Sequence, residues 1–264
     1  MNKIKSKKVL DDIYEEYNRK EFISPDPLEF LYHYTNSDDI ELVGLIASSL
    51  AYGNVKQILK AINSILLPMG ESPYSFITES KQSYLEEKYK GFKYRFTTSE
   101  DIVLLFMGIK DALKEEKTLK ACFESSIKES NNNLLIGSEI FINKIAKYFP
   151  NSSTYLLPKP SKGSACKRFN LFLRWMIRKD DVDFGLWDNK LSEQLIIPLD
   201  THMNNICQTT GISKYKSANL KAAIQITEYF KEINPNDPVK YDFALTRFGI
   251  RAEMDIKEIL NMLK

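Results

Sequence analysis

Apolar residues recur at three- and four-residue spacing along most of this 264-residue chain. Val9 and Ile13 share one helix face in this way, and Leu42, Ile46 and Leu50 share another. Proline or glycine interrupts the spacing repeatedly. Each interruption predicts a helix end, because proline breaks the hydrogen-bond ladder and glycine readily adopts the backbone that terminates a helix. The alternation of apolar and polar residues that is typical of strands is rare. The sequence therefore predicts an all-α fold.

The interruptions divide the chain into a series of expected helices. These cover residues 9–17, 26–34, 38–50, 55–67, 99–109, 135–149, 200–209, 217–233, 240–248 and 255–263, and another begins at residue 167. Short helices rich in tyrosine are expected between residues 72 and 95. Asp38 and Asp39 at one start, and Ser99 at another, are expected N-caps, because such side chains accept hydrogen bonds from the first backbone N–H groups of a helix.

Composition argues against several classes of protein. The 37 basic and 35 acidic residues give a net charge of +2, which by itself does not indicate a nucleic acid as partner. Cys122, Cys166 and Cys207 match neither a disulfide framework nor a metal-binding spacing, so a reducing, cytoplasmic location is expected. No apolar run approaches the ~18 residues of a membrane-spanning helix, and the first residues lack the apolar core of a secretory signal. We expect no membrane partner.

Residues 151–179 form a basic stretch that contains no acidic residue. Its cations are Lys159, Lys162, Lys167, Arg168, Arg174, Arg178 and Lys179. A helix that begins at residue 167 would place apolar and basic residues on opposite faces. The apolar face holds Phe169, Phe172, Leu173, Met176 and Ile177, and the basic face holds Lys167, Arg174 and Arg178. We expect a basic stripe that contacts phosphates; a solvated basic face without a ligand is the simpler alternative.

Lys167 follows a turn of small residues, Gly163 to Ala165. The backbone N–H groups of such a turn can hold a phosphate. The positive end of a helix disfavours a cation, so this is a position at which a lysine amine can act as a nucleophile. The alternative is an ordinary surface lysine near a turn.

Asp200 follows the apolar residues 196–199 and is most simply the N-cap of a helix. A carboxylate close to a nucleophilic amine has a second use, because it can stabilise positive charge on a sugar as its base leaves. His202 lies two residues further on, but His33 is the only other histidine of the chain, so we expect no metal site. A thiol site of Cys166 and His202 lacks an evident third residue to orient it.

Two segments resemble motifs of the helix-hairpin-helix DNA glycosylase superfamily. Residues 163–167 (Gly-Ser-Ala-Cys-Lys) resemble the end of its hairpin motif, Gly-x-Gly-x-Lys, in which the lysine forms a Schiff base. Residues 198–203 (Pro-Leu-Asp-Thr-His-Met) resemble the segment that carries its catalytic aspartate. Residues 41–66 resemble the early helices of that fold, with Asn54 near the turn that probes the duplex. The whole chain also resembles an uncharacterised bacterial family of conserved hypothetical proteins.

The chain departs from the superfamily pattern at three places. Ala165 replaces the second glycine of the hairpin, and its usual Leu-Pro-Gly entry reads Leu-Pro-Lys-Pro-Ser-Lys at residues 157–162. Residues 180–195 resemble an insertion, which lengthens the spacing between lysine and aspartate and is similar to the archaeal oxidised-guanine glycosylases in that respect. The cysteines of the endonuclease III iron–sulfur site are absent from the sequence.

The resemblance implies two helical subdomains with a cleft between them: residues 36–179, and residues 1–35 together with 180–264. It implies a DNA N-glycosylase with AP-lyase activity on a damaged, oxidised base, with Lys167 and Asp200 as catalytic residues, double-stranded DNA as partner, and no cofactor or metal. Expected DNA contacts are Gly163, Ser164, Ala165, Arg168, Asn54, Arg174 and Arg178. Expected residues of a base pocket are His202, Phe243, Arg247 and Phe248.

Two other classes of function fit the same sequence. The chain could be a non-enzymatic DNA-binding protein on this fold, or a protein-interaction scaffold without a nucleic-acid role.

Overall fold

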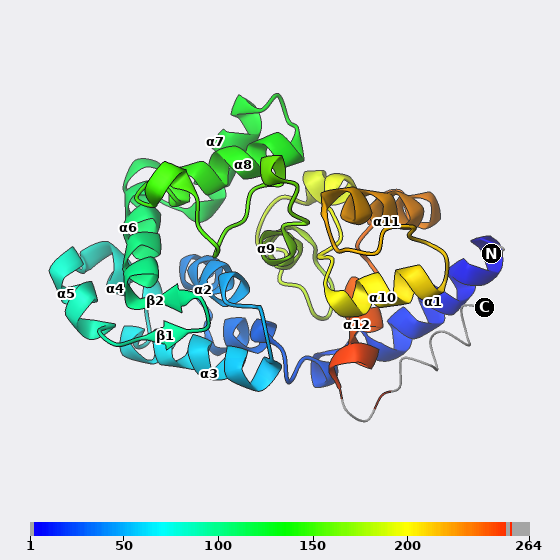
Figure 1. Cartoon of the computed structure of the whole chain (residues 1–264), viewed down its shortest axis with the longest axis horizontal. Coiled ribbons are helices and arrows are strands. Elements are labelled where there is room, and N and C mark those ends of the chain that lie inside the picture. Colours follow the sequence, from blue (N-terminus) through cyan, green and yellow to red (C-terminus); the bar gives the residue numbers. More distant parts are fainter. Residues whose placement is uncertain (1–2, 252–253, 255–264) are drawn as a thin grey trace. The chain divides into compact units, whose positions relative to one another are not determined.

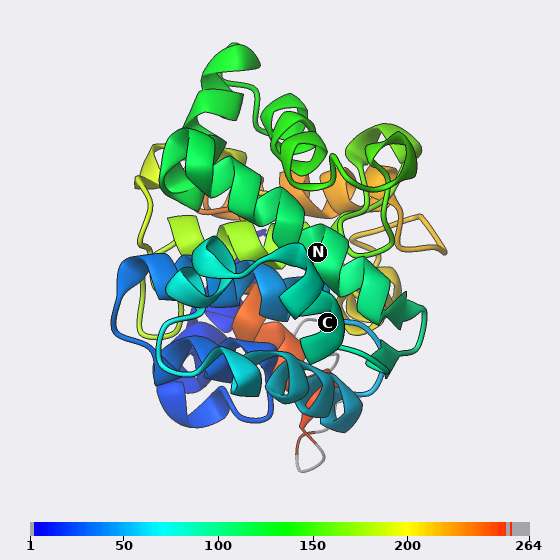
Figure 2. The same ribbon diagram turned by 90° about the vertical axis from the view of Figure 1, so that its left-hand side faces the viewer.

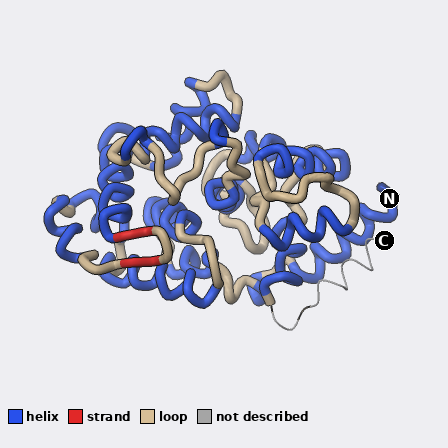
Figure 3. Tube along the Cα trace, in the orientation of Figure 1, coloured by secondary structure: helices blue, strands red, loops and turns tan. Residues whose placement is uncertain are grey.

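The computed structural model describes residues 3–251 and residue 254, and most of them lie in helices (Figure 1). The prediction of an all-α fold is confirmed, with one small addition. Strands β1 (Lys93–Tyr94) and β2 (Thr97–Thr98) pair as an antiparallel hairpin, drawn in red in Figure 3. The chain forms two compact units: unit 1 combines Met1–Asp26 with Gly163–Lys264, and unit 2 consists of Pro27–Lys162.

Unit 1 contains the helices that carry both predicted catalytic residues. They are α1 (Lys3–Tyr17), α9 (Lys167–Ile177), α10 (Thr201–Thr209), α11 (Leu220–Ile233) and α12 (Asp242–Ile250), with the 3-10 helices η1 (Lys20–Phe22) and η6 (Asn189–Gln194). Helix α12 packs against α1 and α10, as Figure 1 shows. The expected helices at 200–209, 217–233 and 240–248 are thus confirmed within a few residues. The expected helix at 255–263 lies outside the described residues.

Helix α9 is enclosed by the segment that follows it. Phe172 and Trp175 are fully buried, and the ring of Trp187 meets that of Phe172 edge-on with centroids 5.2 Å apart. The backbone N–H of Phe184 donates to the Trp175 carbonyl, and that of Trp187 donates to the Met176 carbonyl. These bonds satisfy carbonyls at the helix end that have no partner within the helix. Helix α9 therefore belongs to unit 1, and the division falls at 162/163 and 26/27 instead of the expected 179/180 and 35/36.

Unit 2 is a bundle of shorter helices around α6, coloured from blue through cyan to green in Figure 2. Its elements before the hairpin are η2 (Pro27–His33), α2 (Ser37–Ser49), α3 (Val55–Leu66), η3 (Leu67–Met69), α4 (Pro73–Glu79) and α5 (Gln82–Lys88). After the hairpin come α6 (Ser99–Glu116), α7 (Leu119–Glu129), α8 (Leu134–Ile145), η4 (Pro150–Ser152) and η5 (Pro160–Lys162). Helix α6 packs against α4, α5, α7 and α8. In the described part of the chain, no helix is both long and apolar enough to cross a membrane.

Two helix starts in unit 2 differ from the prediction by one or two residues. The N-cap of α6 is Thr98, not Ser99: the Asp101 carboxylate accepts from the Thr98 N–H at 2.8 Å, and the Thr98 hydroxyl accepts from the Asp101 N–H. This reciprocal pair is a capping box. The cap of α2 is Asn36, whose side-chain oxygen accepts from the Asp38 N–H at 2.8 Å. Thr98 lies directly before the favoured Ser99, and Asn36 lies two residues before the favoured Asp38.

Helices α6 and α8 approach each other closely at Gly108. A Cβ atom at that position would lie 1.8 Å from the carbonyl oxygen of Ile145. Only glycine allows the two backbones to pack this closely, so the contact of α6 with α8 depends on the absence of a side chain at residue 108.

Candidate functional site

The turn before α9 is fixed by contacts with the start of α11. Ser164 forms an isolated antiparallel bridge with Asn219, and the backbone N–H of Leu220 donates to the Gly163 carbonyl at 3.0 Å. Gly163 has a φ of +74°, and Cys166, the N-cap of α9, also lies in the left-handed region with a φ of +48°. Two positive φ values in four residues reverse the chain tightly. The predicted turn is thus found at Gly163, and Ser164 lies in the bridge to Asn219.

Lys167 is the first residue of α9, and its side chain is partly exposed. The Asn170 side-chain amide donates to the Ala165 carbonyl at 3.0 Å, and the Asn170 N–H donates to the Cys166 carbonyl at 2.9 Å. These two bonds join the turn to the helix start and fix the backbone that carries Lys167. Residues 146–166 form turns and short 3-10 helices, so no α-helix precedes the turn directly in this chain.

Asp200 is the N-cap of α10, as the sequence predicts. Its Oδ1 atom accepts from the Met203 N–H at 2.8 Å, and the carboxylate is partly exposed. The four residues that precede it, 196–199, are buried. A carboxylate at a helix N-terminus is stabilised by the positive end of the helix dipole and has a fixed orientation.

The loop between α10 and α11 connects the aspartate to the lysine turn. The Asn204 amide donates to the Lys216 carbonyl at 3.3 Å, and the Gln208 amide donates to the same carbonyl at 3.0 Å. Asn204 lies one helical turn after Asp200, and three residues beyond Lys216 the loop reaches Asn219, the bridge partner of Ser164. Side chains of α10 thus hold the loop that pairs with the turn before Lys167. Both predicted catalytic residues belong to unit 1.

The prediction that Arg174 and Arg178 lie on an exposed basic face of α9 is wrong. The Arg174 side chain is 3% exposed and donates to Asp183 at 3.2 Å and to Asp242 at 2.5 Å. Arg178 is 5% exposed and pairs with Asp183, Asp180 and Asp237. Buried cations require such counter-charges, because removal from water is costly. The two arginines stabilise unit 1 and cannot contact DNA phosphates from these positions.

The buried carboxyls of this network titrate differently from one another. Burial raises the pKa of Asp242 to about 6; Arg174 opposes the shift and the nearby Asp200 adds to it. Burial also raises the pKa of Asp183, against the effect of Arg174 and Arg178. Burial acts on Asp180 in the same direction, but Arg178 and two backbone N–H groups outweigh it and lower the pKa. The influence of Asp200 on Asp242 gives a second link between the predicted aspartate and α9, because Asp242 binds Arg174.

Sequence reasoning missed the acidic half of this network, Asp180, Asp183, Asp237 and Asp242. One signal was available: Asp180 and Asp183 directly follow the acid-free basic stretch. A run of large apolar residues between two arginines also indicates a buried helix, which needs acidic partners for its cations.

Three of the four residues expected in a base pocket lie in the core of unit 1. Phe243 and Phe248 are buried, and Arg247 is 2% exposed. The Arg247 guanidinium donates to Asp26 at 2.7 Å and lies over the Phe243 ring at 4.1 Å from its centroid. The Phe248 ring packs edge-on against Tyr17. These contacts join α12 to the N-terminal segment, so the expectation of a pocket at these three residues is wrong.

The remaining predicted residues differ in exposure. Arg168 is buried, 7% exposed, whereas a phosphate contact needs an accessible cation. His202 is exposed on α10 and lies against Gly249, where a Cβ atom would approach its Nδ1 atom to 2.4 Å. Asn54 is exposed in unit 2, where it caps α3 by accepting from the Lys56 N–H at 3.0 Å.

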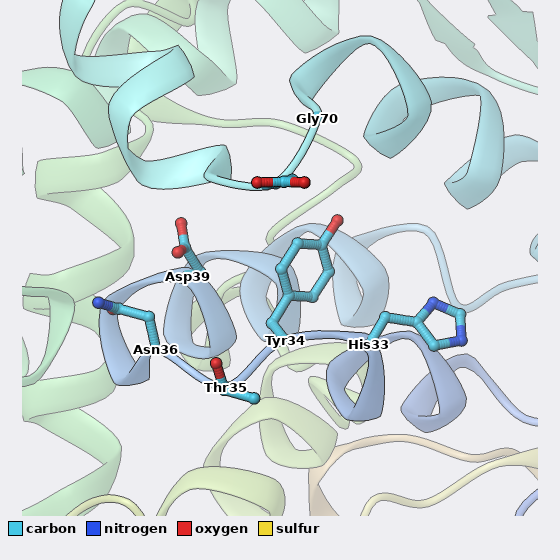
Figure 4. Close-up of a pocket in the computed structure, with 7 residues that line it drawn as sticks. His33, Tyr34, Thr35, Asn36, Asp39 and Gly70 are labelled. Atoms are coloured by element: carbon cyan, nitrogen blue, oxygen red, sulfur yellow. The ribbon is translucent and has the colours of Figure 1, made fainter.

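Unit 2 contains a pocket of about 410 Å³, shown in Figure 4. Its lining residues are His33, Tyr34, Thr35, Asn36, Asp39, Gly70 and Glu71. Tyr34 and Asp39 point toward the segment at Gly70. Asp39 is buried and accepts from the Ser72 hydroxyl at 3.1 Å and from the Tyr74 N–H at 2.8 Å, which makes it a cap of α4. Burial raises the pKa of Tyr34, and Asp39 adds to the shift. None of the residues that the sequence predicted as functional lines this pocket.

Fold and site together define a mostly helical protein with a lysine at the start of one helix and an aspartate that caps another. The family described as "Protein of unknown function (DUF2400)" matches residues 26–251, and the chain belongs to this family. No curated protein and no solved structure matches the chain. The family description names no activity, so we infer the function from the side chains of unit 1.

Proposed function

We propose that this protein is a DNA N-glycosylase with AP-lyase activity, which removes a damaged, oxidised base through a Schiff base on Lys167. The observation that carries the proposal is the placement of Lys167 and Asp200. One is the first residue of a helix directly after a tight turn, the other is the N-cap of a later helix, and both belong to unit 1. The order of the two segments is the one that the resemblance implies.

In this mechanism the target base has left the stack, and the neutral Lys167 amine attacks C1′ of the sugar that carries this base. The C1′–Nζ bond forms, and the base leaves with the electron pair of its glycosidic bond and takes up a proton. Opening of the sugar ring between C1′ and O4′ gives the Schiff base. Loss of a C2′ proton then expels the 3′ phosphate and cuts the strand, and water hydrolyses the imine to free the lysine.

Asp200 stabilises the positive charge that develops on the sugar as the base leaves. Its Oδ1 atom is held by the Met203 N–H, so the carboxylate is oriented before the substrate arrives. A group fixed in advance stabilises a transition state without reorganisation at the moment of reaction. Gly163 and Ser164 would contact the backbone phosphate next to the target, because both are small and Gly163 is exposed, whereas Ala165, expected from the sequence to contact DNA, is buried.

Borohydride trapping on duplexes that carry a panel of oxidised and alkylated bases and an abasic site tests the proposal. We expect a covalent protein–DNA product with the wild type and none with Lys167→Gln. Lys221→Gln is a matched control, since Lys221 is an exposed lysine in the first turn of α11 in the same unit, and it should retain trapping. If the wild type traps no more than Lys167→Gln across the panel, the enzyme proposal fails. Salt-dependent duplex binding that survives Lys167→Gln and Asp200→Asn without strand cutting would then identify a non-enzymatic DNA-binding protein.

A further inference from the structure

The tip of the β1–β2 hairpin in unit 2 carries two large aromatic rings in contact with water. The Phe96 side chain is 67% exposed, and Tyr155, whose ring centroid lies 5.4 Å from that of Phe96, is 52% exposed. The Arg95 guanidinium lies 5.8 Å from the centroid of the Phe96 ring. We call Arg95, Phe96 and Tyr155 the hairpin tip. Adjacent exposed rings on a folded surface are unfavourable in water and are typical of binding surfaces.

The hairpin tip rests on a rigid support. The Tyr52 ring lies against both Tyr94 and Tyr155, with centroid distances of 4.9 Å and 5.1 Å. The Tyr52 hydroxyl donates to the Tyr94 carbonyl at 3.0 Å and lies 2.7 Å from the Thr97 hydroxyl, from which it can accept. Side chains on both strands therefore fix the hairpin. A surface that is ordered before binding loses less conformational entropy when a partner arrives.

The tip also lies beside the turn at Gly53 and Asn54. Gly53 has a φ of +100°, and a Cβ atom there would lie 2.7 Å from Nη1 of Arg95 and 2.9 Å from the Tyr94 hydroxyl. The Arg95 side chain thus occupies the space that a larger residue would take at position 53. This contact brings Asn54, a residue expected to bind DNA, next to the hairpin tip.

The chain segments that build this surface are cationic. Residues 52–60, 91–98 and 151–161 contain no acidic residue, although the whole chain is close to neutral. Their cations are Lys56, Lys60, Lys93, Arg95 and Lys159. Glu100 and Asp101 follow the hairpin at the start of α6, where Asp101 is engaged by Thr98. Exposed rings among cations match a partner that offers flat π-faces and negative charge together, and a nucleic acid has both.

We propose that the hairpin tip binds nucleic acid at an unstacked base, with Phe96 and Tyr155 stacking on the base and Arg95, Lys93 and Lys56 contacting phosphates. In an intact duplex each base face is covered by its neighbours, so a protein ring stacks only where a face is exposed. The tip should therefore prefer a gap, an abasic site or a single strand over intact duplex. This inference rests on nucleic acid as the partner in the proposed function, but not on the chemistry of Lys167.

Full-length protein and a duplex with 2-aminopurine next to a one-nucleotide gap provide the test, with anisotropy for affinity and 2-aminopurine quenching for stacking. We expect Phe96→Ala to weaken binding to the gapped duplex about five- to a hundredfold and to abolish quenching, with little effect on intact duplex. Phe96→Tyr should retain both signals. Arg95→Ala should weaken binding to both duplexes and lower the salt slope by about one.

The matched controls are Tyr84→Ala, an exposed aromatic residue on α5, and Lys128→Ala, an exposed cation on α7. Neither should change affinity. The proposal is overturned if the wild type binds none of these nucleic acids, if Phe96→Ala equals the wild type on the gapped duplex, or if Tyr84→Ala weakens binding as much as Phe96→Ala. Comparison of binding with the borohydride trapping of wild type and Lys167→Gln separates the two proposals. If binding to the gapped duplex depends on Phe96 but the wild type gives no trapped product, the lysine chemistry is refuted and the hairpin tip remains supported.

Discussion

The Arg174 guanidinium on α9 and the Asp242 carboxylate at the start of α12 lie 2.5 Å apart in the core of unit 1, with both side chains almost fully buried. Arg174 also reaches Asp183, so one cation joins α9 to the segment that follows it and to α12, which begins 68 residues after Arg174. Asp200 lies near this ion pair and adds to the rise in the pKa of Asp242, so the pair is close to the aspartate of the proposed site.

Removal of the Arg174 charge should strongly destabilise unit 1. Arg174→Met keeps most of the aliphatic volume but removes the cation that pairs with the buried Asp242 carboxylate and leaves Asp183 with Arg178 alone. Removal of one partner of a buried ion pair costs about 3–5 kcal/mol. Urea unfolding monitored by circular dichroism measures the loss. Lys179→Met, at an exposed position two residues after α9, should change the free energy of unfolding by less than ~0.5 kcal/mol. Equal unfolding midpoints for Arg174→Met and the wild type would contradict the importance of the pair.

Asp242 should also make stability depend on pH. Its folded-state pKa is raised from 3.8 to about 6 by burial, so the folded protein holds a proton that the unfolded chain releases. The stabilisation from this proton is fully present below about pH 4 and is lost as the pH rises through about 6. Across that window the wild type should lose about 3 kcal/mol relative to Asp242→Asn, which does not titrate. Unfolding of both proteins at several pH values measures this difference, and a constant gap would refute the expectation.

Local signals explain why so many helices could be predicted from the sequence. Asp200 caps α10, and the break at Pro68 ends α3, because capping and proline geometry act within a few residues of the chain. The position of Lys167 at the first turn of α9 was predictable for the same reason. Each of these features depends only on neighbouring residues.

The burial of the basic side chains of α9 could not be predicted from neighbouring residues. Helical periodicity separates basic from apolar faces on α9, but it does not say whether the basic face meets water or carboxylates. The partner of Arg174 lies 68 residues later, at Asp242, and its position depends on how α12 packs. The β1–β2 hairpin escaped prediction because strands of two residues are too short to show alternation.

Close helix packing at Gly108 gives a prediction for unit 2. Gly108→Ala places a methyl group where the Ile145 carbonyl oxygen lies, so α6 and α8 must move apart. We expect a loss of about 3 kcal/mol or more in the free energy of unfolding, despite the higher helix propensity of alanine. Lys114→Ala, at an exposed position of the same helix, should stay within a few tenths of a kcal/mol of the wild type. Thermal and urea unfolding compare the three proteins, and a Gly108→Ala protein as stable as the wild type would show that the two helices can separate without cost.

Asp200 has both a structural and a proposed chemical role, and two substitutions separate them. Asparagine caps a helix about as well as aspartate, so Asp200→Asn should keep wild-type stability, whereas Asp200→Ala should lose about 1 kcal/mol. Both should slow base excision about a hundredfold or more, because neither provides a negative charge for the sugar. The chemical effect is measured as the single-turnover rate of base excision on the damaged duplex that gives a borohydride-trapped product with the wild type. The structural effect is measured as the free energy of unfolding of each protein. A wild-type excision rate for Asp200→Asn would assign Asp200 to capping alone, since the only property lost in that variant is the charge.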